Sequence, residues 1–276
     1  MRNSFIAPEI SIIILNYKSA KLTRQCIKGV KKFQPKASYE IIVVDNNSKD
    51  GVAEMLEEKY PEVIFIGSKI NRGYGAGMNL GIAKAGGEYI LILNPDIVIL
   101  DNSIESLYEF MKEHPDAGIA GPKLLNPDGT VQSSYFRFHT IMTPLYRRTP
   151  LGKLPWAKEH LNRFLMAENQ SNGRPRTVEW ILGACMMARK TALQKIGLFD
   201  ERFFLYLEDT DLCRRTWENG YKVYYAADSE MVHYHMRESA KYSGLMSVLS
   251  YPTRVHIASW IKYILKYKDK QIPKIN

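Results

Sequence analysis

Cysteine is scarce in this sequence, which contains only Cys26, Cys185 and Cys213. These three residues are far apart and odd in number, and neither a CxxC pair nor the Cys/His spacing of a zinc site occurs. A disulfide framework and a structural zinc site are therefore not expected. We expect three ordinary buried thiols in a protein of a reducing compartment.

Long hydrophobic runs are also missing. The apolar run at residues 10–15 is far shorter than the ~20 apolar residues that a transmembrane helix needs. It is also too short for the core of a secretory signal, and it is typical of a strand. We therefore expect a cytoplasmic protein that is soluble or attached peripherally at the inner face of the cell membrane.

Negative charge is in deficit, since 38 Lys and Arg stand against 29 Asp and Glu, and the net charge is +9. This balance favours anionic partners, namely nucleotides, lipid diphosphates, an anionic membrane surface or nucleic acid. A basic protein whose surface charge binds nothing is an equal alternative. Because the basic residues are dispersed and no recognition motif is present, we do not expect a nucleic-acid partner.

Apolar runs alternate with helical patterns along the first 121 residues. The strand-like runs are residues 9–15, 40–44, 63–66 and 89–93. The helical patterns that follow them span 22–32, 51–60, 71–85 and 103–113. Asp50 and Asp101 are placed to cap the second and fourth helices. The alternation predicts an α/β fold in which helices flank a central, mostly parallel sheet.

The pattern is less regular after residue 121. We interpret residues 135–176 as a long functional loop or lid, or simply as a poorly ordered insertion. We expect this region to contact the acceptor of a reaction, but no residue in it can be assigned. The elements expected beyond it are an ordered stretch at 178–188, helices at 191–196 and from 209 to before 220, and a strand at 221–226.

The tail at residues 245–268 has an apolar face with lysines beside it. The face comprises Ile257, Trp260, Ile261, Ile264 and Leu265, and the lysines are Lys262, Lys266 and Lys268. Such a helix can lie on an anionic membrane surface. The alternative, which we prefer, is that its apolar face packs against the rest of the protein.

Three of the predicted strands end in polar side chains. Asn16 follows the first strand, Asp45 and Asn47 the second, and Asn94 and Asp96 the fourth. In an open α/β sheet, ligands bind where the strands end. Each ending could be a plain strand stop, but three on one edge indicate a site. An aspartate at position 96 suits Mg²⁺ or Mn²⁺, and a bound diphosphate would supply further oxygen ligands.

One glycine-rich motif and one acidic motif provide further candidate site residues. Residues 73–77 resemble a dinucleotide fingerprint, but the full GxGxxG spacing is absent and the motif follows the third strand, so we discount an NAD enzyme. Glu208, Asp209 and Asp211 follow the apolar residues 203–207. They either cap the next helix or include a general base, because apolar surroundings raise a carboxyl pKa into a useful range. We favour the base.

Seven stretches carry a resemblance when they are taken together and in order. They are ISIIILNY, IIVVDNNSKDG, NRGYGAGMNLGI, YILILNPDIVI, WILGACMMARK, IGLFDERFFLYLEDTDLCRR and VHYHMRES. In this order they resemble the family 2 inverting glycosyltransferases of the GT-A fold, and above all their bacterial rhamnosyltransferase-like branch. The resemblance covers about residues 9–239.

The resemblance implies a donor site and a metal site. Asp45 would contact the donor base. The other donor-binding residues would be Asn16, Asn47, Asn71, Gly73, Asn79, Asn94 and Asp96. Asp96 matches the last acid of the family's metal-binding DxD motif, whose first position is Asn94 here, and this departure leaves the role of Asn94 open. His233, or His235 in its place, would complete the metal shell.

The resemblance also implies the catalytic residues, the wall of the site and the domain bounds. Asp209, next to Glu208, matches the catalytic base. The wall on the acceptor or sugar side would be formed by Trp180, Gly183 and Ala184. The implied glycosyltransferase domain is 1–240, with a donor half at 1–122 and an acceptor half at 123–240. A basic, amphipathic helical extension would follow at 241–276.

The implied reaction is an inverting, metal-dependent sugar transfer in cell-surface polysaccharide synthesis. We expect dTDP-linked rhamnose as the donor, or a UDP-hexose in its place, and a saccharide or lipid-linked saccharide as the acceptor. A sugar-phosphate nucleotidyltransferase is the nearest rival, but it should carry a glycine-rich basic loop at residues 16–20, which contain no glycine. A sugar-nucleotide-binding protein without turnover is the second alternative.

Overall fold

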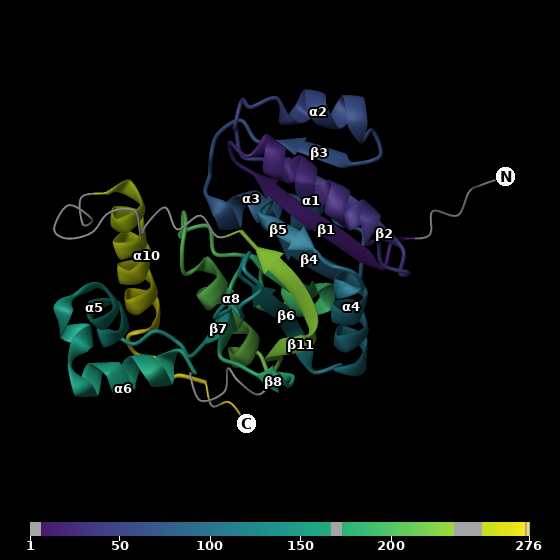
Figure 1. The fold of residues 1–276 in the computed structure, drawn as a ribbon. Coiled ribbons are helices and arrows are strands. Elements are labelled where there is room, and N and C mark those ends of the chain that lie inside the picture. The colour runs from purple at the N-terminus through teal and green to yellow at the C-terminus, as the bar shows by residue number, and fades with distance from the viewer. Residues whose placement is uncertain (1–6, 167–172, 235–249, 274, 276) are drawn as a thin grey trace.

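The computed structural model describes residues 7–166, 173–234, 250–273 and 275 of the chain. Figure 1 shows a central sheet with helices packed against it and, to one side, a group of short helices beside a long C-terminal helix. The strands of the sheet follow the order β3-β2-β1-β4-β10-β6-β11-β5, and β8 pairs with β11 outside this path. The predicted α/β class is confirmed.

The first half of the sheet is parallel. Its strands are β1 (Ile10–Asn16), β2 (Tyr39–Asp45), β3 (Ile64–Gly67) and β4 (Tyr89–Leu93). Ile12 and Ile14 of β1 join one core cluster, whereas Ile13 and Leu15 join the cluster on the opposite face. A strand buried on both faces has apolar residues at successive positions, which explains the continuous runs in the sequence. All four predicted strands are confirmed to within one residue at each end.

Helices cover both faces of this sheet. α1 (Ala20–Lys32), α2 (Val52–Lys59) and α4 (Ser103–Glu113) contribute apolar side chains to one core cluster. α3 (Tyr74–Lys84), α7 (Lys190–Ile196) and α8 (Glu208–Glu218) contribute to the other. Each fully buried aliphatic side chain of these helices stabilises the fold by about 1.5–3 kcal/mol.

The two predicted helix caps are wrong. Gly51 and Asn102, both in the left-handed conformation, stand directly before α2 and α4. Asp50 instead accepts a hydrogen bond at 2.9 Å from the backbone N–H of Ala20, where α1 begins. Asp101 lies one residue further from α4 than a cap would. The tertiary approach of the loop after β2 to α1 therefore decides the role of Asp50.

The second half of the sheet is mixed. Its strands are β5 (Ile97–Ile99), β6 (Ala117–Leu125), β8 (Arg176–Thr177), β10 (Cys185–Arg189) and β11 (Lys222–His233). β10 lies antiparallel between β4 and β6, and β11 is parallel to β6 and antiparallel to β5. The sequence did not predict β6, because Gly118, Gly121 and Pro122 interrupt its apolar pattern. β11 also extends seven residues beyond the predicted end at residue 226.

The region predicted to be irregular contains helices, and this part of the prediction is wrong. Between β7 (Tyr135–Phe136) and β9 (Trp180–Ile181), which pair with each other, lie α5 (Met142–Arg148), η1 (Pro150–Lys153) and α6 (Pro155–Phe164). Proline occupies the first turn of η1 and α6, where its missing N–H has no helical partner to lose. We call residues 141–164 the helical lobe.

The C-terminal helix α10 (Tyr251–Tyr267) packs on the segment before α8. Tyr263 and Tyr267 form a small core with Phe203 and Leu207, and Trp260 and Ile264 pack against it. The expected apolar face is therefore divided, because Ile257, Ile261 and Leu265 are exposed. The preferred packing alternative holds for part of this face. In the part of the chain that the structure describes, no helix is both long and apolar enough to cross a membrane.

Candidate functional site

A buried hydrogen-bond network organises the edge where β1 and β2 end. The Nδ2 of Asn16, whose side chain is fully buried, donates to Asp45 Oδ1 at 2.9 Å and to Ser48 Oγ at 3.0 Å. Its Oδ1 accepts a hydrogen bond from Thr23 Oγ1 at 2.9 Å. Asn16 therefore shapes the predicted donor site from behind, and the half-buried Asp45 is the carboxylate at its surface.

Asn46 connects this edge to the glycine-rich turn, and no role was predicted for it. Its Nδ2 donates to Asn71 Oδ1 and to Gly73 O, both at 2.9 Å, and its Oδ1 accepts from the backbone N–H of Arg72 at 3.2 Å. The neighbouring Asn47 has a φ of 62°, a left-handed conformation that Asn tolerates better than most residues. The predicted donor residues Asn47, Asn71 and Gly73 are thus held close together by Asn46.

The segment 199–207 lies against the start of α3. The backbone N–H of Tyr74 donates to Phe204 O at 2.8 Å, and a Cβ on Gly73, which has a φ of 92°, would collide with the same carbonyl oxygen. Asn79 holds the other end of the segment, because its side-chain amide donates to Phe199 O and accepts from Phe199 N. Its amide is therefore engaged with the segment that leads to the predicted base.

Asp96 and His233 lie together at the junction of β4, β5 and β11. His233 Nε2 is 3.5 Å from Asp96 Oδ2, and His233 Nδ1 is 2.8 Å from Gln132 Oε1. Asp96 Oδ1 is buried and has no hydrogen-bond partner among the described residues. A buried carboxylate oxygen that needs a partner, next to an imidazole nitrogen, fits a divalent cation.

The protein supplies few ligands for such a cation. Within the described residues, no group of three or more His, Cys, Asp and Glu side chains is arranged as a metal cluster. A cation on Asp96 and His233 would therefore need further oxygens, which the diphosphate of a nucleotide can supply. His235 lies outside the described residues. Asn94 contributes its backbone N–H, which donates to Ala184 O at 2.8 Å.

Asp209 and Glu208 begin helix α8, and their environments differ. Asp209 is half-buried and accepts hydrogen bonds from the backbone N–H of Gly183 at 2.9 Å and of Thr210 at 2.7 Å. Glu208 is buried, and its Oε2 has no hydrogen-bond partner in the described ranges. Burial raises the pKa of both carboxyls, and it raises the pKa of Glu208 well above its ordinary value. The backbone donors around Asp209 favour its ionised form, so Glu208 is the acid of the pair that is more readily protonated.

Tyr74 and Gly183 join the metal side of the site to Asp209. The hydroxyl of Tyr74 donates to Gly183 O at 2.6 Å, while Gly183 N donates to Asp209. Burial raises the pKa of Tyr74 well above its usual range, and the charges of Glu208, Asp209 and Asp96 raise it further. Tyr74 was not predicted, although its position between Gly73 and Gly75 was the available signal.

All three residues of the predicted sugar-side wall, Trp180, Gly183 and Ala184, are buried. Gly183 touches Asp209, and a Cβ at Gly183 would lie 3.1 Å from the Cβ of Asp209. Trp180 instead lies in the core with 5% of its surface exposed, stacked on Phe136, and its indole N–H donates to Arg137 O at 2.7 Å. An indole packed in this way presents little surface to a ligand, so its predicted role as a wall has no support here.

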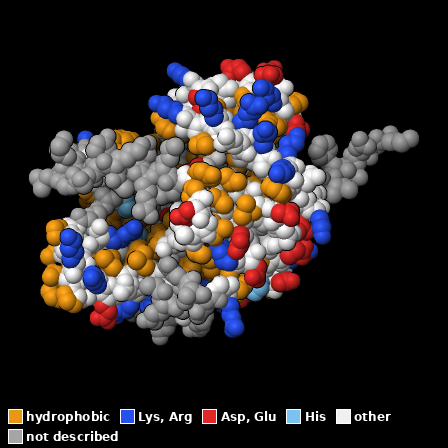
Figure 2. All heavy atoms as spheres, viewed as in Figure 1, with side chains coloured by type: hydrophobic (Ala, Val, Ile, Leu, Met, Phe, Trp, Pro, Cys, Tyr) orange, Lys and Arg blue, Asp and Glu red, His pale blue; other side chains and the backbone are white. Residues whose placement is uncertain are grey.

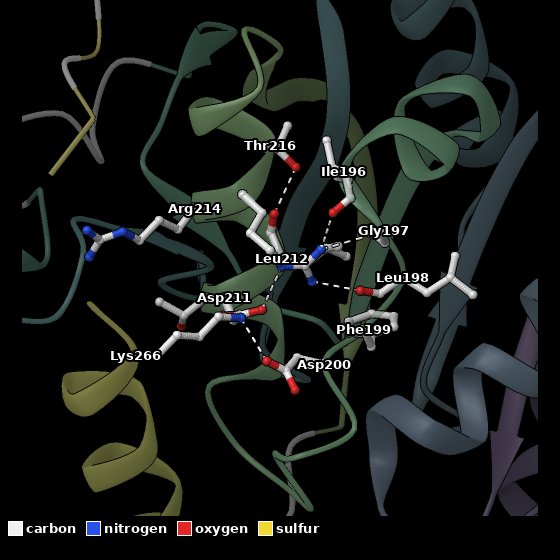
Figure 3. Close-up of polar contacts among 12 residues, drawn as sticks. Ile196, Gly197, Leu198, Phe199, Asp200, Asp211, Leu212, Arg214, Thr216 and Lys266 are labelled. Carbon is white, nitrogen blue, oxygen red and sulfur yellow. Dashed lines mark hydrogen bonds and ion pairs between the residues drawn. The ribbon is translucent and has the colours of Figure 1, made fainter. Parts of the chain in front are cut away.

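Asp211, the third acid of the cluster, has a different function from its neighbours. It is fully buried and accepts from Arg215 Nε at 2.8 Å, Lys266 Nζ at 2.5 Å and Tyr267 Oη at 2.7 Å. Figure 3 shows Lys266 reaching from α10 towards both Asp211 and Asp200. This ion-pair network fastens the C-terminal helix to the segment before Asp209. The same network engages Lys266, one of the lysines expected beside the apolar face of this helix.

Comparison with known proteins identifies the class to which this fold and site belong. The model of the family "Glycosyl transferase family 2" matches residues 11–197. That match covers more than half of the chain and includes the strand edge, the glycine-rich turn, Asp96 and Gly183. The chain belongs to glycosyl transferase family 2.

Curated relatives narrow the comparison. The chain is 29% identical to the N-acetylglucosaminyl-diphospho-decaprenol L-rhamnosyltransferase of Mycobacterium tuberculosis, over 70% of this chain and 66% of that protein. It is 31% identical to the low-salt glycan biosynthesis hexosyltransferase Agl10 of Haloferax volcanii, over 75% of this chain and 61% of that protein. Rhamnosyltransferase WbbL of Escherichia coli is 25% identical over 83% of each chain. The chain thus spans about two thirds of the length of its first relatives.

Solved structures share the fold. GalNAc-T7, solved with UDP, GalNAc and Mn²⁺, superposes with a TM-score of 0.69 at 17% identity, covering 96% of this chain and 49% of that one. Mannosyltransferase PcManGT from Pyrobaculum calidifontis, solved with GDP-Man and Mn²⁺, superposes with a TM-score of 0.57 at 16% identity, covering 85% of this chain and 59% of that one. The predicted GT-A fold is confirmed.

Proposed function

We propose that this chain transfers a sugar, with inversion, from a nucleoside-diphosphate sugar to a hydroxyl of a saccharide acceptor in cell-surface polysaccharide synthesis. The observation that carries the proposal is that residues 183 and 184 link the two acidic regions: the N–H of Asn94, two residues before Asp96, donates to Ala184 O, and the N–H of the adjacent Gly183 donates to Asp209. Asp96, whose buried Oδ1 has no partner among the described residues, and Asp209, whose pKa is raised by burial, then flank the same site. Diphosphate departure and deprotonation of the acceptor need this arrangement.

Asp209 is the proposed general base. In an inverting transfer, the acceptor oxygen attacks the anomeric carbon while the bond from that carbon to the diphosphate oxygen breaks. The hydroxyl proton passes to a carboxylate oxygen of Asp209, whose raised pKa makes it a better proton acceptor than an exposed aspartate. The N–H groups of Gly183 and Thr210 fix the orientation of this carboxylate, and the neutral Glu208 beside it adds no second negative charge.

Asp96 and His233 are the proposed protein ligands of a divalent cation, Mg²⁺ or Mn²⁺. When bound, such a cation supplies Lewis-acid stabilisation to the leaving diphosphate. The buried Oδ1 of Asp96 supports this assignment, and so does Gln132, which orients the imidazole through Nδ1. The two GT-A structures solved with Mn²⁺ are consistent with it.

Asp45 is the proposed contact to the donor base, with Asn47 and Asn71 beside it. Two hydrogen bonds keep the Asp45 carboxylate in place, since Asn16 Nδ2 and the backbone N–H of Ser48 both donate to it. The rhamnosyltransferase names of two relatives favour dTDP-rhamnose as the donor, and a UDP-hexose is the alternative. Solved neighbours with UDP and with GDP-Man support a nucleoside diphosphate in either case.

The proposed acceptor is a saccharide, and a lipid-linked saccharide fits the diphospho-decaprenol named for the mycobacterial relative. A cavity of about 340 Å³ at the base of the helical lobe offers polar groups for such a ligand. Its lining includes Arg137, Thr140, His160 and Glu179. A lipid-linked acceptor places the enzyme at the membrane periphery, and a membrane contact was the less favoured of the two roles expected for α10. Its exposed Ile257, Ile261 and Leu265 keep that prediction open.

The deciding experiment is a thermal-shift panel of dTDP, UDP, GDP and NAD, each with and without Mn²⁺. A ligand that binds only the native state raises the melting temperature by mass action. We expect one nucleoside diphosphate to stabilise the protein in a Mn²⁺-dependent way, and Asp96→Asn to abolish the metal dependence. Stabilisation by NAD alone, or by none of the diphosphates, would overturn the proposed function.

A further inference from the structure

The helical lobe exposes large apolar side chains within a short stretch of chain. The exposed fractions are 61% for Ile141, 39% for Met142, 41% for Leu145, 44% for Leu151 and 60% for Trp156. Single exposed apolar residues are ordinary, but a contiguous group marks an interaction surface. Figure 2 shows hydrophobic side chains along the outer edge of this lobe, with Lys and Arg side chains beside them.

These side chains are not the unfinished core of the lobe. The lobe buries a different set, with Thr143 and Ala157 fully buried and Phe164 3% exposed. Phe164 stacks on Phe136, which anchors the end of α6 to the small β7–β9 sheet. The lobe therefore has an inner face that attaches it to the enzyme and an outer face whose large apolar side chains stay substantially exposed among the described residues.

The charge of the lobe identifies the kind of surface it would meet. Residues 141–164 contain five Lys or Arg and one Glu. Arg147, Lys153, Lys158 and Arg163 are exposed, and Glu159 pairs with Arg163 at 3.0 Å. Exposed Trp, Leu and Ile flanked by basic residues are the pattern of helices that lie in the interface of an anionic bilayer. A protein partner with an apolar patch would not need this excess of positive charge.

We propose that the helical lobe is the membrane-docking surface of this enzyme, with Trp156, Leu151 and Leu145 entering the headgroup region of an anionic bilayer. This inference deepens the proposed function, because it rests on an acceptor that is held at a membrane. It places the contact on α5, η1 and the start of α6 rather than on α10. Lys266 of α10 is engaged by Asp200 and Asp211, and Lys262 Nζ donates to Arg202 O, so those two lysines face the protein.

The test is co-sedimentation of the full chain with vesicles of neutral lipid alone and of neutral lipid with anionic phosphatidylglycerol. We expect binding to the anionic vesicles and a shift of Trp emission to shorter wavelength, since Trp156 leaves water. Leu151→Glu with Trp156→Glu should lower the vesicle partition coefficient at least ~10-fold, because each change places a charge in the interface. Trp156→Phe should keep most of the binding and lose most of the spectral shift.

Two matched variants make the result specific. Ile70→Glu changes a residue that is 62% exposed in the loop before α3, outside the lobe, and it should bind vesicles as the wild type does. Ile261→Glu with Leu265→Glu changes the exposed face of α10, and it should lower the partition coefficient less than the lobe variant does. An unchanged melting temperature, and an unchanged thermal shift with the donor nucleotide, show that each variant is folded.

Several results would overturn the docking surface. They are no vesicle binding by the wild type, equal binding by the lobe variant, or loss of binding only in the α10 variant. Vesicle binding without a shift of Trp emission would mean that surface charge alone holds the protein to the bilayer, and it would exclude insertion of Trp156. A wild-type dimer that the lobe variant dissociates, without vesicle binding, would make this face a contact between copies of the chain. Vesicle binding in a protein that binds no nucleoside diphosphate would retain the surface and reject the proposed reaction.

Discussion

The strand edge around Asp45 and the first turn of α8 both gather carboxylates, but the protein treats them in opposite ways. At the strand edge, Asp45 and Asp50 receive hydrogen bonds from the Asn16 amide and from backbone N–H groups. At α8, Glu208 is buried with an unpartnered oxygen, and burial raises its pKa and that of Asp209. Both regions supply donors to a carboxylate, but at α8 burial outweighs them and makes charge costly.

This difference separates binding from proton transfer. A carboxylate that is well supplied with donors near the surface is held in position and is suited to hold a ligand by hydrogen bonds. A carboxylate in apolar surroundings gains affinity for a proton and is suited to take one from a hydroxyl. Variants of the two regions should therefore fail in different ways, and the predictions below run from the largest expected effect to the smallest.

Asp209→Asn should have the largest effect. We expect kcat to fall by roughly 10³-fold, within the 10²–10⁴ range of general-base contributions, because the amide cannot accept the acceptor proton. Donor binding, measured by nucleotide thermal shift, should be retained, since Asp45 and Asp96 are untouched. A variant with wild-type turnover would remove Asp209 from the role of base. In the wild type, kcat should fall as pH drops through the raised pKa of Asp209.

Asp96→Asn tests the metal side of the site. Because Lewis-acid stabilisation of a leaving diphosphate amounts to several kcal/mol, we expect activity to fall by about 10²-fold or more. The Mn²⁺ dependence of nucleotide binding should disappear as well. Chelation of the wild type by EDTA should abolish activity, and added Mn²⁺ should restore it. Full activity after exhaustive chelation would contradict the metal role.

Asp45→Ala probes the binding region. Loss of one hydrogen-bonded contact to the donor base should raise the donor KM about 10-fold, equivalent to ~1.4 kcal/mol, with kcat little changed. Steady-state kinetics over donor concentration separate the two parameters. A fall in kcat at unchanged KM would mean that the strand edge takes part in chemistry, and the contrast with α8 would be lost.

Glu208→Gln should produce the smallest and most pH-dependent effect. The folded protein holds a proton on Glu208 that the unfolded chain releases, so this group contributes stability at low pH, and that stability is lost as pH rises through the raised pKa. The variant should match the wild type near pH 5 and exceed its melting temperature at pH 9, by on the order of 2–4 °C per kcal/mol. Asp50→Asn, the matched change at the strand edge, should lower the melting temperature instead, because an NH₂ group replaces one of the two oxygens that accept from the Asn16 amide and the Ala20 N–H. A higher melting temperature for Asp50→Asn would erase the distinction between the two regions.

Much of the donor half could be predicted from residues alone. The strands β1 to β4 were found because burial on both faces leaves an unbroken apolar run, and Asp45 and Asp96 were predicted as site residues because they follow such runs. Strand β6 was missed because glycine and proline interrupt its pattern. The helices of the lobe were missed because short, proline-started helices with exposed apolar residues lack a clear helical stripe.

The sequence by itself determined the α/β alternation, the polar strand ends and the acidic cluster at 208–211, because these depend on neighbouring residues along the chain. Only the tertiary structure decided what each acid does. It buried Glu208 with its Oε2 unpartnered among the described residues, turned Asp211 to Lys266 and Tyr267, and brought Gly183 to Asp209. The physical reason is that hydrogen-bond partners and burial come from segments tens of residues away, and these set the charge state of a carboxylate.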